Sequence, residues 1–294
     1  MASSFLRPST VPEVLEELAG GGAHLWAGGT ATGQALRLGA EFPQRLVGLG
    51  RVAALQTIGL ERHGELRLGS MVSLHSLATD SVVIRHAPIL AAAAASVGNE
   101  RIRRAATLGG HLVQGEADFD IPPVLLVLQA QMRLASSRGE RTLEFARFLL
   151  QEPRRPDELL IEILLPPRQA GTVSAFQKFN PQSLEAPGLI VVAGTLTPSA
   201  DGSHLEDVRL AAGGAGASAL RLRSTEARLN GSRPEIAAIR EAARLSTRDI
   251  APRDDLRASA EYRREMVAVW SRRLLERLGS AVLGTTREGG HHED

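Results

Sequence analysis

The sequence predicts a mixed α/β protein, with a parallel α/β part over its first 170 residues and a sheet-plus-helix part after them. The segment from His24 to Leu49 has the pattern of a strand, a glycine turn, a helix and a second strand, which favours a parallel sheet. After residue 170, three strand patterns come first and long arginine- and alanine-rich segments follow. At 294 residues, the chain is also long enough for two or three domains.

The composition excludes several classes of protein. A net charge of +1 gives no general attraction to nucleic acid, and no apolar run reaches the roughly 18 residues that a membrane helix needs. The first twenty residues lack the pattern of a signal sequence, so a cytoplasmic protein is expected. The absence of cysteine excludes disulfides, a cysteine nucleophile and thiolate ligands for zinc or iron–sulfur clusters. A redox role would therefore need an organic cofactor or a partner chain.

The elements expected up to residue 60 are a helix at 11–18, a strand at 24–27, a helix at 32–38 and a strand at 45–49. Thr10 can cap the first helix, Pro12 suits its first turn, and the glycines at 20–22 end it. The second strand runs directly into Gly28-Gly29-Thr30. This alternation of strands and helices predicts the parallel sheet.

The middle of the chain, from 61 to 170, alternates between further strand and helix patterns. The expected elements are a strand at 65–70, helices at 74–78, 89–97 and 121–128, a turn at 107–112, and strands at 131–136 and 159–165. Pro166-Pro167 ends the last of these strands, so we place a domain boundary near residue 170.

The last third is different in character. Strands are expected at 176–179, 189–196 and 208–212, and helices at 225–230, 234–245 and 258–278. In the last segment, apolar residues recur at helical spacing with arginines and glutamates between them. The tail after Gly284 is polar and is expected to be disordered, with His291 and His292 in a frayed end rather than in a metal site.

Two glycine pairs are the most informative candidates for a binding site. Gly28-Gly29-Thr30 follows a strand, and Gly109-Gly110-His111 has apolar neighbours. A Gly-Gly step allows positive φ and brings backbone N–H groups close to an anion, and a following helix N-terminus adds a favourable dipole. Two such loops could hold the two phosphates of a dinucleotide. The alternative is two ordinary tight turns.

A third glycine motif, Gly214-x-Gly216-x-x-Ala219, matches the dinucleotide fingerprint, and Glu235 lies at the distance of a ribose-binding acid. The residues after it form a poor opening helix, and no βαβ unit precedes it. We therefore expect it to be a decoy. The acidic set Glu116, Asp118 and Asp120 is expected to be a loop with one functional acid and two solvated ones.

Several ordered segments together resemble one family, the FAD-binding medium subunits of molybdenum hydroxylases, which include carbon monoxide dehydrogenase and xanthine dehydrogenase. Residues 26–30 resemble its first flavin loop, and residues 97–103 with 106–112 resemble its second. Asp120 falls where the family has an acid, and Phe176-Gln177-Lys178 resembles its Phe-x-Lys. Further similar segments are Gly213-Gly214-Ala215 with Arg221 and Glu226, and 257–264.

The resemblance implies a fold. It implies a two-domain FAD-binding fold of the PCMH type plus a C-terminal domain with a small antiparallel sheet and helices. The implied domains are an N-terminal FAD-binding subdomain at 1–60, a middle FAD-binding subdomain at 61–170, a C-terminal domain at 171–284 and a disordered tail at 285–294.

The resemblance also implies a set of FAD-binding residues and no metal ligand. They are Leu25, Trp26, Ala27, Gly28, Gly29, Thr30, Ala31, Thr32, Thr107, Gly109, Gly110, His111, Val113, Gln114, Asp120, Leu160 and Lys178. Threonine hydroxyls can donate to phosphate, and Asp120 can accept from ribityl hydroxyls. Lys178, the only lysine, can sit near the pyrimidine end of the flavin. The alternative for Lys178 is an ordinary surface position.

The implied function is an electron-transfer subunit of an oxidoreductase, which takes electrons from an iron–sulfur small subunit while a molybdopterin large subunit oxidises the substrate. The implied assembly is a dimer of heterotrimers. The substrate stays open, as does the acceptor, which could be NAD, oxygen or quinone. Asn180-Pro181-Gln182-Ser183 replaces a basic run of the family, so one alternative is a flavin-free scaffold subunit. Another is a stand-alone nucleotide-dependent oxidoreductase that uses the Gly214 motif.

Overall fold

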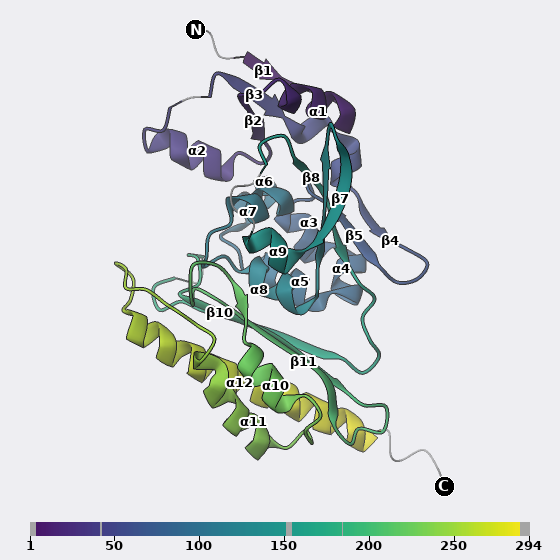
Figure 1. Cartoon of the computed structure of the whole chain (residues 1–294), viewed down its shortest axis with the longest axis vertical. Coiled ribbons are helices and arrows are strands. Elements are labelled where there is room, and N and C mark those ends of the chain that lie inside the picture. Colours follow the sequence, from purple (N-terminus) through teal and green to yellow (C-terminus); the bar gives the residue numbers. More distant parts are fainter. Residues whose placement is uncertain (1–3, 42, 151–154, 184, 289–294) are drawn as a thin grey trace. The chain divides into compact units, whose positions relative to one another are not determined.

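The computed structural model describes residues 4–41, 43–150, 155–183 and 185–288, and it confirms a mixed α/β protein (Figure 1). The chain divides into two compact units. Unit 1 comprises Met1–His86, Val97–Gly115 and Gln129–Pro167, and unit 2 comprises Ala87–Ser96, Glu116–Leu128 and Arg168–Asp294. Two segments from the middle of the sequence thus belong with its last third. The expected three-domain division at residues 60 and 170 stays a prediction.

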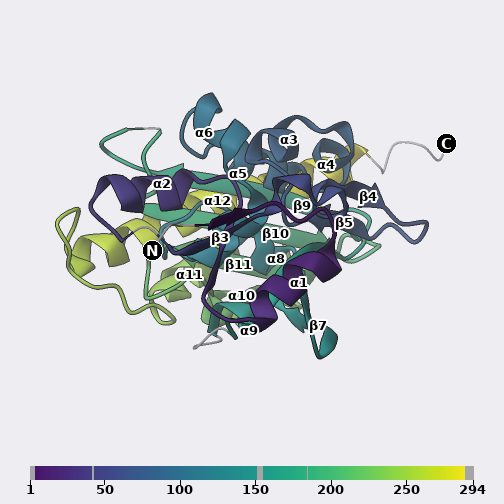
Figure 2. The ribbon, with the colours of Figure 1, turned by 90° about the horizontal axis from the view of Figure 1, so that it is seen from above.

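Unit 1 begins with a three-stranded parallel sheet in the order β1-β3-β2. Its elements are β1 (Ser4–Leu6), α1 (Val11–Ala19), β2 (Ala23–Trp26), α2 (Thr30–Arg37) and β3 (Arg45–Gly48). Thr10 caps α1 by accepting from the Glu13 N–H. The connection from β1 to β2 and the connection from β2 to β3 run in opposite directions across the sheet. Right-handed crossovers of this kind place their helices on opposite faces, and α1 and α2 lie on opposite faces (Figure 2). The predicted βαβ unit is confirmed, whereas the three-residue β1 gave no pattern in the sequence.

Unit 1 also contains a five-stranded antiparallel sheet in the order β4-β5-β8-β6-β7. Its strands are β4 (Ile58–Leu60), β5 (Leu66–Gly69), β6 (Gln131–Ser136), β7 (Gly139–Glu144) and β8 (Leu159–Leu165). Around it lie α3 (Leu74–Thr79), α4 (Ser81–His86), α6 (Glu100–Ala105), α7 (Leu108–Gln114), α9 (Phe145–Leu150) and the 3-10 turns Leu49–Arg51 and Ala53–Gln56. One apolar cluster joins the two sheets, since it includes Val14 of α1, Val47 of β3 and Leu159 of β8.

The expected turn at 107–112 is wrong, because this segment forms the helix α7. Thr107 caps the helix, since its Oγ1 accepts the Gly110 N–H at 3.1 Å. Gly115 ends it in the left-handed conformation at φ 66°. Capping and burial outweigh the low helix propensity of two glycines here. The second glycine pair therefore lies in the first turn of a helix.

Unit 2 is built on a four-stranded antiparallel sheet in the order β12-β11-β10-β9. Its strands are β9 (Val173–Phe179), β10 (Ile190–Pro198), β11 (Leu205–Gly213) and β12 (Leu220–Arg221). The helices are α5 (Pro88–Ala95), α8 (Ile121–Val127), α10 (Arg223–Leu229), α11 (Ile236–Ala243) and α12 (Ala260–Glu288), with a 3-10 turn at Arg244–Thr247. α5 and α8 cover one face and α12 covers the other (Figure 1), so nearly all of β10 is buried.

The C-terminal helix is longer than expected. α12 runs to Glu288, so residues 285–288, expected in a disordered tail, are helical. Residues 289–294, with His291 and His292, lie outside the described residues.

The segment after the Gly214 motif does not open directly into a helix, as the sequence predicts. Gly214 has φ +73°, and a Cβ on it would lie 2.2 Å from the Leu189 carbonyl oxygen. The chain then enters the short strand β12, where a dinucleotide fingerprint requires a helix. The nearby buried Glu226 accepts from the Leu210 N–H at 2.9 Å and pairs with Arg221. This block of the family signature therefore stabilises unit 2.

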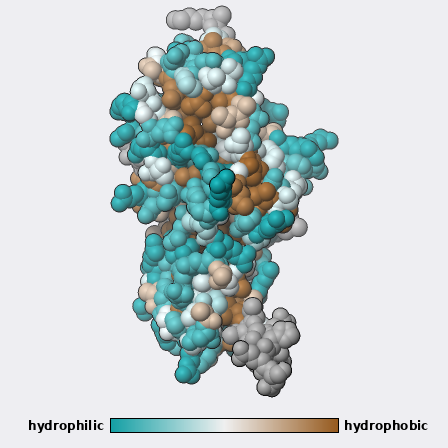
Figure 3. Space-filling model, turned by 90° about the vertical axis from the view of Figure 1, so that its right-hand side faces the viewer, coloured by the Kyte–Doolittle hydropathy of each residue, from teal (hydrophilic) through white to brown (hydrophobic). Residues whose placement is uncertain are grey.

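The surface is mainly hydrophilic on the face in Figure 3, with apolar residues in patches between polar ones. Large exposed apolar side chains include Leu38, Leu150 and Leu256. None of the helices within the described ranges combines the length and the apolar character needed to cross a membrane.

Candidate functional site

The first glycine pair lies where β2 passes into α2. A Cβ on Gly28 would lie 1.8 Å from the carbonyl oxygen of Ala105, so only glycine lets these two backbone segments approach. Gly29 caps α2 with φ 70°, and a Cβ on it would lie 2.5 Å from the Trp26 ring. The expectation of a positive φ is confirmed for Gly29 and is wrong for Gly28. At Gly28, the close contact with Ala105 requires glycine.

In the second glycine pair, Gly109 packs against Ser70, and Gly110 comes near Ala27 of the first loop. The Gly109 N–H donates to the Ser70 carbonyl at 2.7 Å, and a Cβ on Gly109 would lie 2.7 Å from the Ser70 Cβ. A Cβ on Gly110 would lie 2.9 Å from Thr107 Oγ1 and 3.8 Å from the Ala27 Cβ. Neither glycine has positive φ, so the expected backbone nest is wrong here, and close packing at a helix start replaces it. The structure does bring the two loops together.

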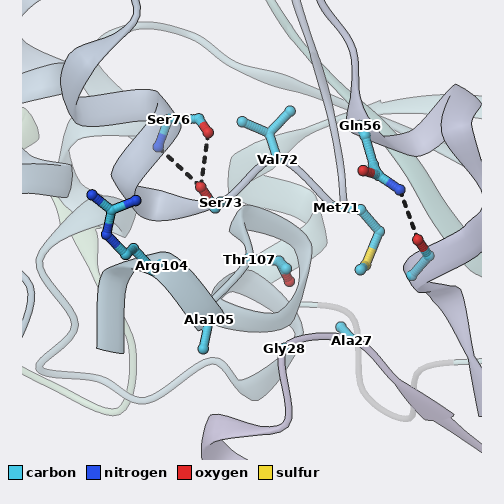
Figure 4. A pocket seen from close by; sticks show the side chains of 11 residues that line it. Ala27, Gly28, Gln56, Met71, Val72, Ser73, Ser76, Arg104, Ala105 and Thr107 are labelled. Atoms are coloured by element: carbon cyan, nitrogen blue, oxygen red, sulfur yellow. Dashed lines mark hydrogen bonds between the residues drawn. The ribbon is translucent and has the colours of Figure 1, made fainter. Parts of the chain in front are cut away.

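A cavity of about 310 Å³ opens beside these loops, within unit 1 (Figure 4). Ala27, Gly28, Ala105 and Thr107 form one part of its wall. The rest of the wall combines Gly50, Met71 and Val72 with four polar side chains, namely Gln56, Ser73, Ser76 and Arg104. The cavity therefore combines backbone from both loops with hydroxyl, amide and guanidinium donors.

Thr107 is a buried residue that lines the cavity and caps the helix with the second glycine pair. Its Oγ1 accepts the Gly110 N–H with one lone pair, which leaves the O–H free to donate to an anion. Ser73 Oγ accepts the Ser76 N–H at 3.0 Å and lies 2.8 Å from Ser76 Oγ. Arg104 forms an exposed ion pair with Glu100 at 2.7 Å. An anionic ligand would find several donors here.

Asp120 and Lys178 form a buried ion pair in unit 2. Lys178 Nζ lies 2.7 Å from Asp120 Oδ2, and the side chains are only 8% and 3% exposed. Nζ also donates to the Ser96 carbonyl at 2.9 Å, and Ser96 Oγ donates to Asp120 Oδ2 at 3.2 Å. Burial raises the pKa of Asp120, and the Lys178 ammonium acts against this rise. Lys178 is therefore not the surface lysine of the alternative interpretation.

The other two acids of the 116–120 loop do not complete a metal site. The expectation that Asp118 is solvated is wrong, because it is partly buried and paired with Arg257. Within the described part of the chain, no group of three or more histidine, aspartate or glutamate residues could hold a metal ion.

The remaining expected residues are spread over unit 1. Leu25 lies in β2, whereas Thr30, Ala31 and Thr32 form the first turn of α2. On α7, His111 is buried and Val113 is exposed, with Gln114 at the C-terminal end. Leu160 is buried in β8. Their assignment to the cofactor stays a prediction.

The sequence missed several polar residues of these sites. Ser73, Ser76 and Arg104 line the cavity, and Ser96 bridges the buried pair. The Ser-x-x-Ser spacing of a helix cap was a usable signal for Ser73. Nothing near Ser96 in the sequence indicates its contact with a lysine 82 residues away.

Comparison with known proteins gives a consistent result over nearly the whole chain. Residues 1–168 match the family described as FAD binding domain in molybdopterin dehydrogenase, and residues 188–278 match the CO dehydrogenase flavoprotein C-terminal domain. The nicotine 6-hydroxylase medium subunit of Paenarthrobacter nicotinovorans is 32% identical over 86% of this chain and 89% of that subunit. The xanthine dehydrogenase FAD-binding subunit of Escherichia coli O157:H7 is 26% identical over 96% of this chain and 98% of that subunit.

Solved structures agree with these relatives. A chain of carbon monoxide dehydrogenase from Hydrogenophaga pseudoflava superposes with a TM-score of 0.89 and 25% identity, over 96% of this chain and 98% of that one. Quinoline 2-oxidoreductase from Pseudomonas putida 86 gives 0.88 and 25% over 96% and 99%. The chain therefore belongs to the family of FAD-binding medium subunits of molybdenum hydroxylases, and it is a subunit of an oxidoreductase.

Proposed function

We propose that this chain binds FAD, receives electrons from an iron–sulfur subunit and passes them to an external acceptor. The observation that carries the proposal is the contact between the two glycine loops. A Cβ on Gly28 would lie 1.8 Å from the carbonyl oxygen of Ala105, just before the second loop, and a Cβ on Gly110 would lie 3.8 Å from the Ala27 Cβ of the first loop. The family and the relatives named above support FAD as the ligand.

The residues at this contact fit the diphosphate of FAD. Backbone N–H groups at the start of α2 point out of the left-handed cap at Gly29 and can donate to phosphate oxygens. The hydroxyls of Thr30, Thr32 and Thr107 are further donors that we assign to the same group. Because these donors are neutral, the diphosphate would be held without a cluster of lysines, which this sequence does not contain.

Asp120 and Lys178 are assigned to the flavin by the family resemblance. The Lys178 ammonium is a compact charge held in place by two oxygen acceptors, and it would favour negative charge that develops nearby. Asp120 keeps that charge paired when no ligand is near. Bound FAD supplies the one- and two-electron chemistry that connects a cluster donor to the final acceptor.

The electron donor has to be carried by another chain, because iron–sulfur clusters are held by cysteine thiolates and this sequence has none. We propose an iron–sulfur small subunit and a molybdopterin large subunit as partners, in a dimer of heterotrimers. The relatives include the medium chain of a carbon monoxide dehydrogenase, which supports such an assembly. The cytoplasmic location and the choice among NAD, oxygen and quinone stay predictions.

Affinity purification from the native organism tests this assembly. The tagged chain is expected to bring down two further chains and, by metal analysis, iron and molybdenum. The isolated chain, assayed with dye acceptors, is expected not to oxidise aldehydes, purines or carbon monoxide. Oxidation of any of these by the chain alone, free of molybdenum and iron, would contradict the proposal. A purified complex that contains neither iron nor molybdenum would also contradict it.

A further inference from the structure

Arg257 connects two loops of unit 2 that both lead to the buried Asp120. It stands just before α12 and is partly buried. One guanidinium nitrogen, Nη1, pairs with Asp118, two residues before Asp120. The other, Nη2, donates to the Pro187 carbonyl at 2.7 Å. One planar side chain thus holds a carboxylate and a carbonyl from segments about 70 residues apart.

Pro187 immediately precedes the residue that faces Asp120 from the β9–β10 loop. Gly188 packs against this carboxyl, because a Cβ on Gly188 would lie 3.5 Å from Asp120 Oδ1, a buried oxygen that accepts no hydrogen bond within the described residues. Asn180 also donates to the Pro187 carbonyl, at 2.7 Å. The Pro187 carbonyl therefore accepts from both Asn180 and Arg257, one residue before the glycine that packs against Asp120.

The segment that carries Arg257 is itself fixed. Asp255 Oδ1 accepts the Arg257 N–H at 2.8 Å, and Oδ2 accepts from Arg263 Nη2 at 2.6 Å. The buried Arg263 also donates to the carbonyls of Leu189 and Gly214 at 3.0 and 3.1 Å. Asp255 therefore links the backbone of Arg257 to Arg263 of α12, which fixes the backbone that carries the Arg257 side chain.

We propose that Arg257 is a positioning residue, which holds Asp118 and Pro187 so that Gly188 stays packed against Asp120, the acid that pairs with Lys178. This inference rests on the proposed function, since it concerns the pair that we assign to the flavin. Without Arg257, Pro187 loses its link to Asp118 and so to the 116–120 loop. Gly188 and Asp120 then move apart, and Asp120 no longer holds the Lys178 ammonium in one position.

The test uses the full chain, purified and loaded with FAD, as wild type, Arg257→Ala and Arg257→Lys. In Arg257→Ala, amide hydrogen exchange is expected to rise in peptides that span Gly188, while β11 keeps wild-type protection. The dissociation constant for FAD is expected to rise about tenfold, a loss of about 1.4 kcal/mol. The flavin reduction potential is expected to shift as well. Lysine should restore part of each effect, because it keeps the charge but lacks the two-pronged geometry.

Arg264→Ala is the matched control, since Arg264 is exposed on α12, in the turns of the helix that follow Arg257. It is expected to match wild type in every readout. If Arg257→Ala is insoluble, Asp118→Asn serves instead, because it weakens the same bond at nearly constant shape. Wild-type protection at Gly188 together with wild-type affinity and potential in the Arg257 or Asp118 variant would overturn the inference. Failure of the wild type itself to bind FAD would instead overturn the proposed function, and the exchange readout would still test the role of Arg257.

Discussion

Replacing Gly28 by alanine is expected to abolish FAD binding. The new Cβ would lie 1.8 Å from the Ala105 carbonyl oxygen, which is backbone and cannot rotate away. The two loops must therefore separate, and the donors at the start of α2 and α7 no longer face the same diphosphate. We expect the dissociation constant for FAD to rise by about a hundredfold or more, which corresponds to about 2.8 kcal/mol. Flavin absorbance of the purified variant and a fluorescence titration with FAD measure this.

Two glycines provide matched controls for that result. Gly33 lies in the same helix with no heavy atom within 4 Å of its Cβ position, and alanine there should keep FAD and stabilise the helix by up to about 1 kcal/mol. Gly216 has only ordinary contacts, at 3.5 Å or more, so its alanine variant should also keep FAD. Loss of FAD in the Gly216 variant, with FAD retained in the Gly28 variant, would contradict the assignment of the site.

Replacing Asp120 by alanine is expected to cause the largest loss of stability in unit 2. The Lys178 side chain is only 8% exposed, so its ammonium would stay buried with no opposing charge at 2.7 Å. Breaking a buried pair from one side costs about 3–5 kcal/mol. Urea unfolding, followed by fluorescence of the tryptophans, measures the free energy of unfolding.

The double variant Asp120→Ala/Lys178→Met separates the charge effect from general loss of packing. Methionine removes the buried charge at similar volume, so the double variant should recover most of the lost stability. A double variant as unstable as Asp120→Ala alone would show that the ion pair is not the cause. Neither variant is expected to bind FAD with wild-type affinity, because Lys178 is displaced in one and absent in the other.

Local patterns predicted the elements of the fold well, because those elements depend on their own residues. The strand before Gly28, the cap at Thr10 and the alternation before Ser70 all appear in the structure. The error at 107–112 has a local cause. The two glycines favour a turn because of their low helix propensity, but the Thr107 cap stabilises a helix there. The three-residue strands β1 and β4 are too short to show a period.

Long-range pairing could not be predicted. The apolar segment at 121–128 indicates a buried helix, but nothing local shows that α8 packs on β10 and β11, which begin only at Ile190 and Leu205. The sequence predicts both Asp120 and Lys178 as cofactor-binding residues. No pattern in the sequence indicates that they bond to each other across 58 residues. Gly28 is predicted from its capacity for positive φ, but glycine is required there because the Ala105 carbonyl lies too close for a Cβ.

The visible absorption spectrum of the purified chain, with identification of its extracted cofactor, tests the central claim most directly. The account predicts flavin bands and an extracted cofactor that contains adenine, so that it is FAD and not FMN. It also predicts that flavin-free protein regains these bands when FAD is added. A colourless protein that fails to bind added FAD, even with its partner subunits present, would contradict the account and favour a scaffold subunit.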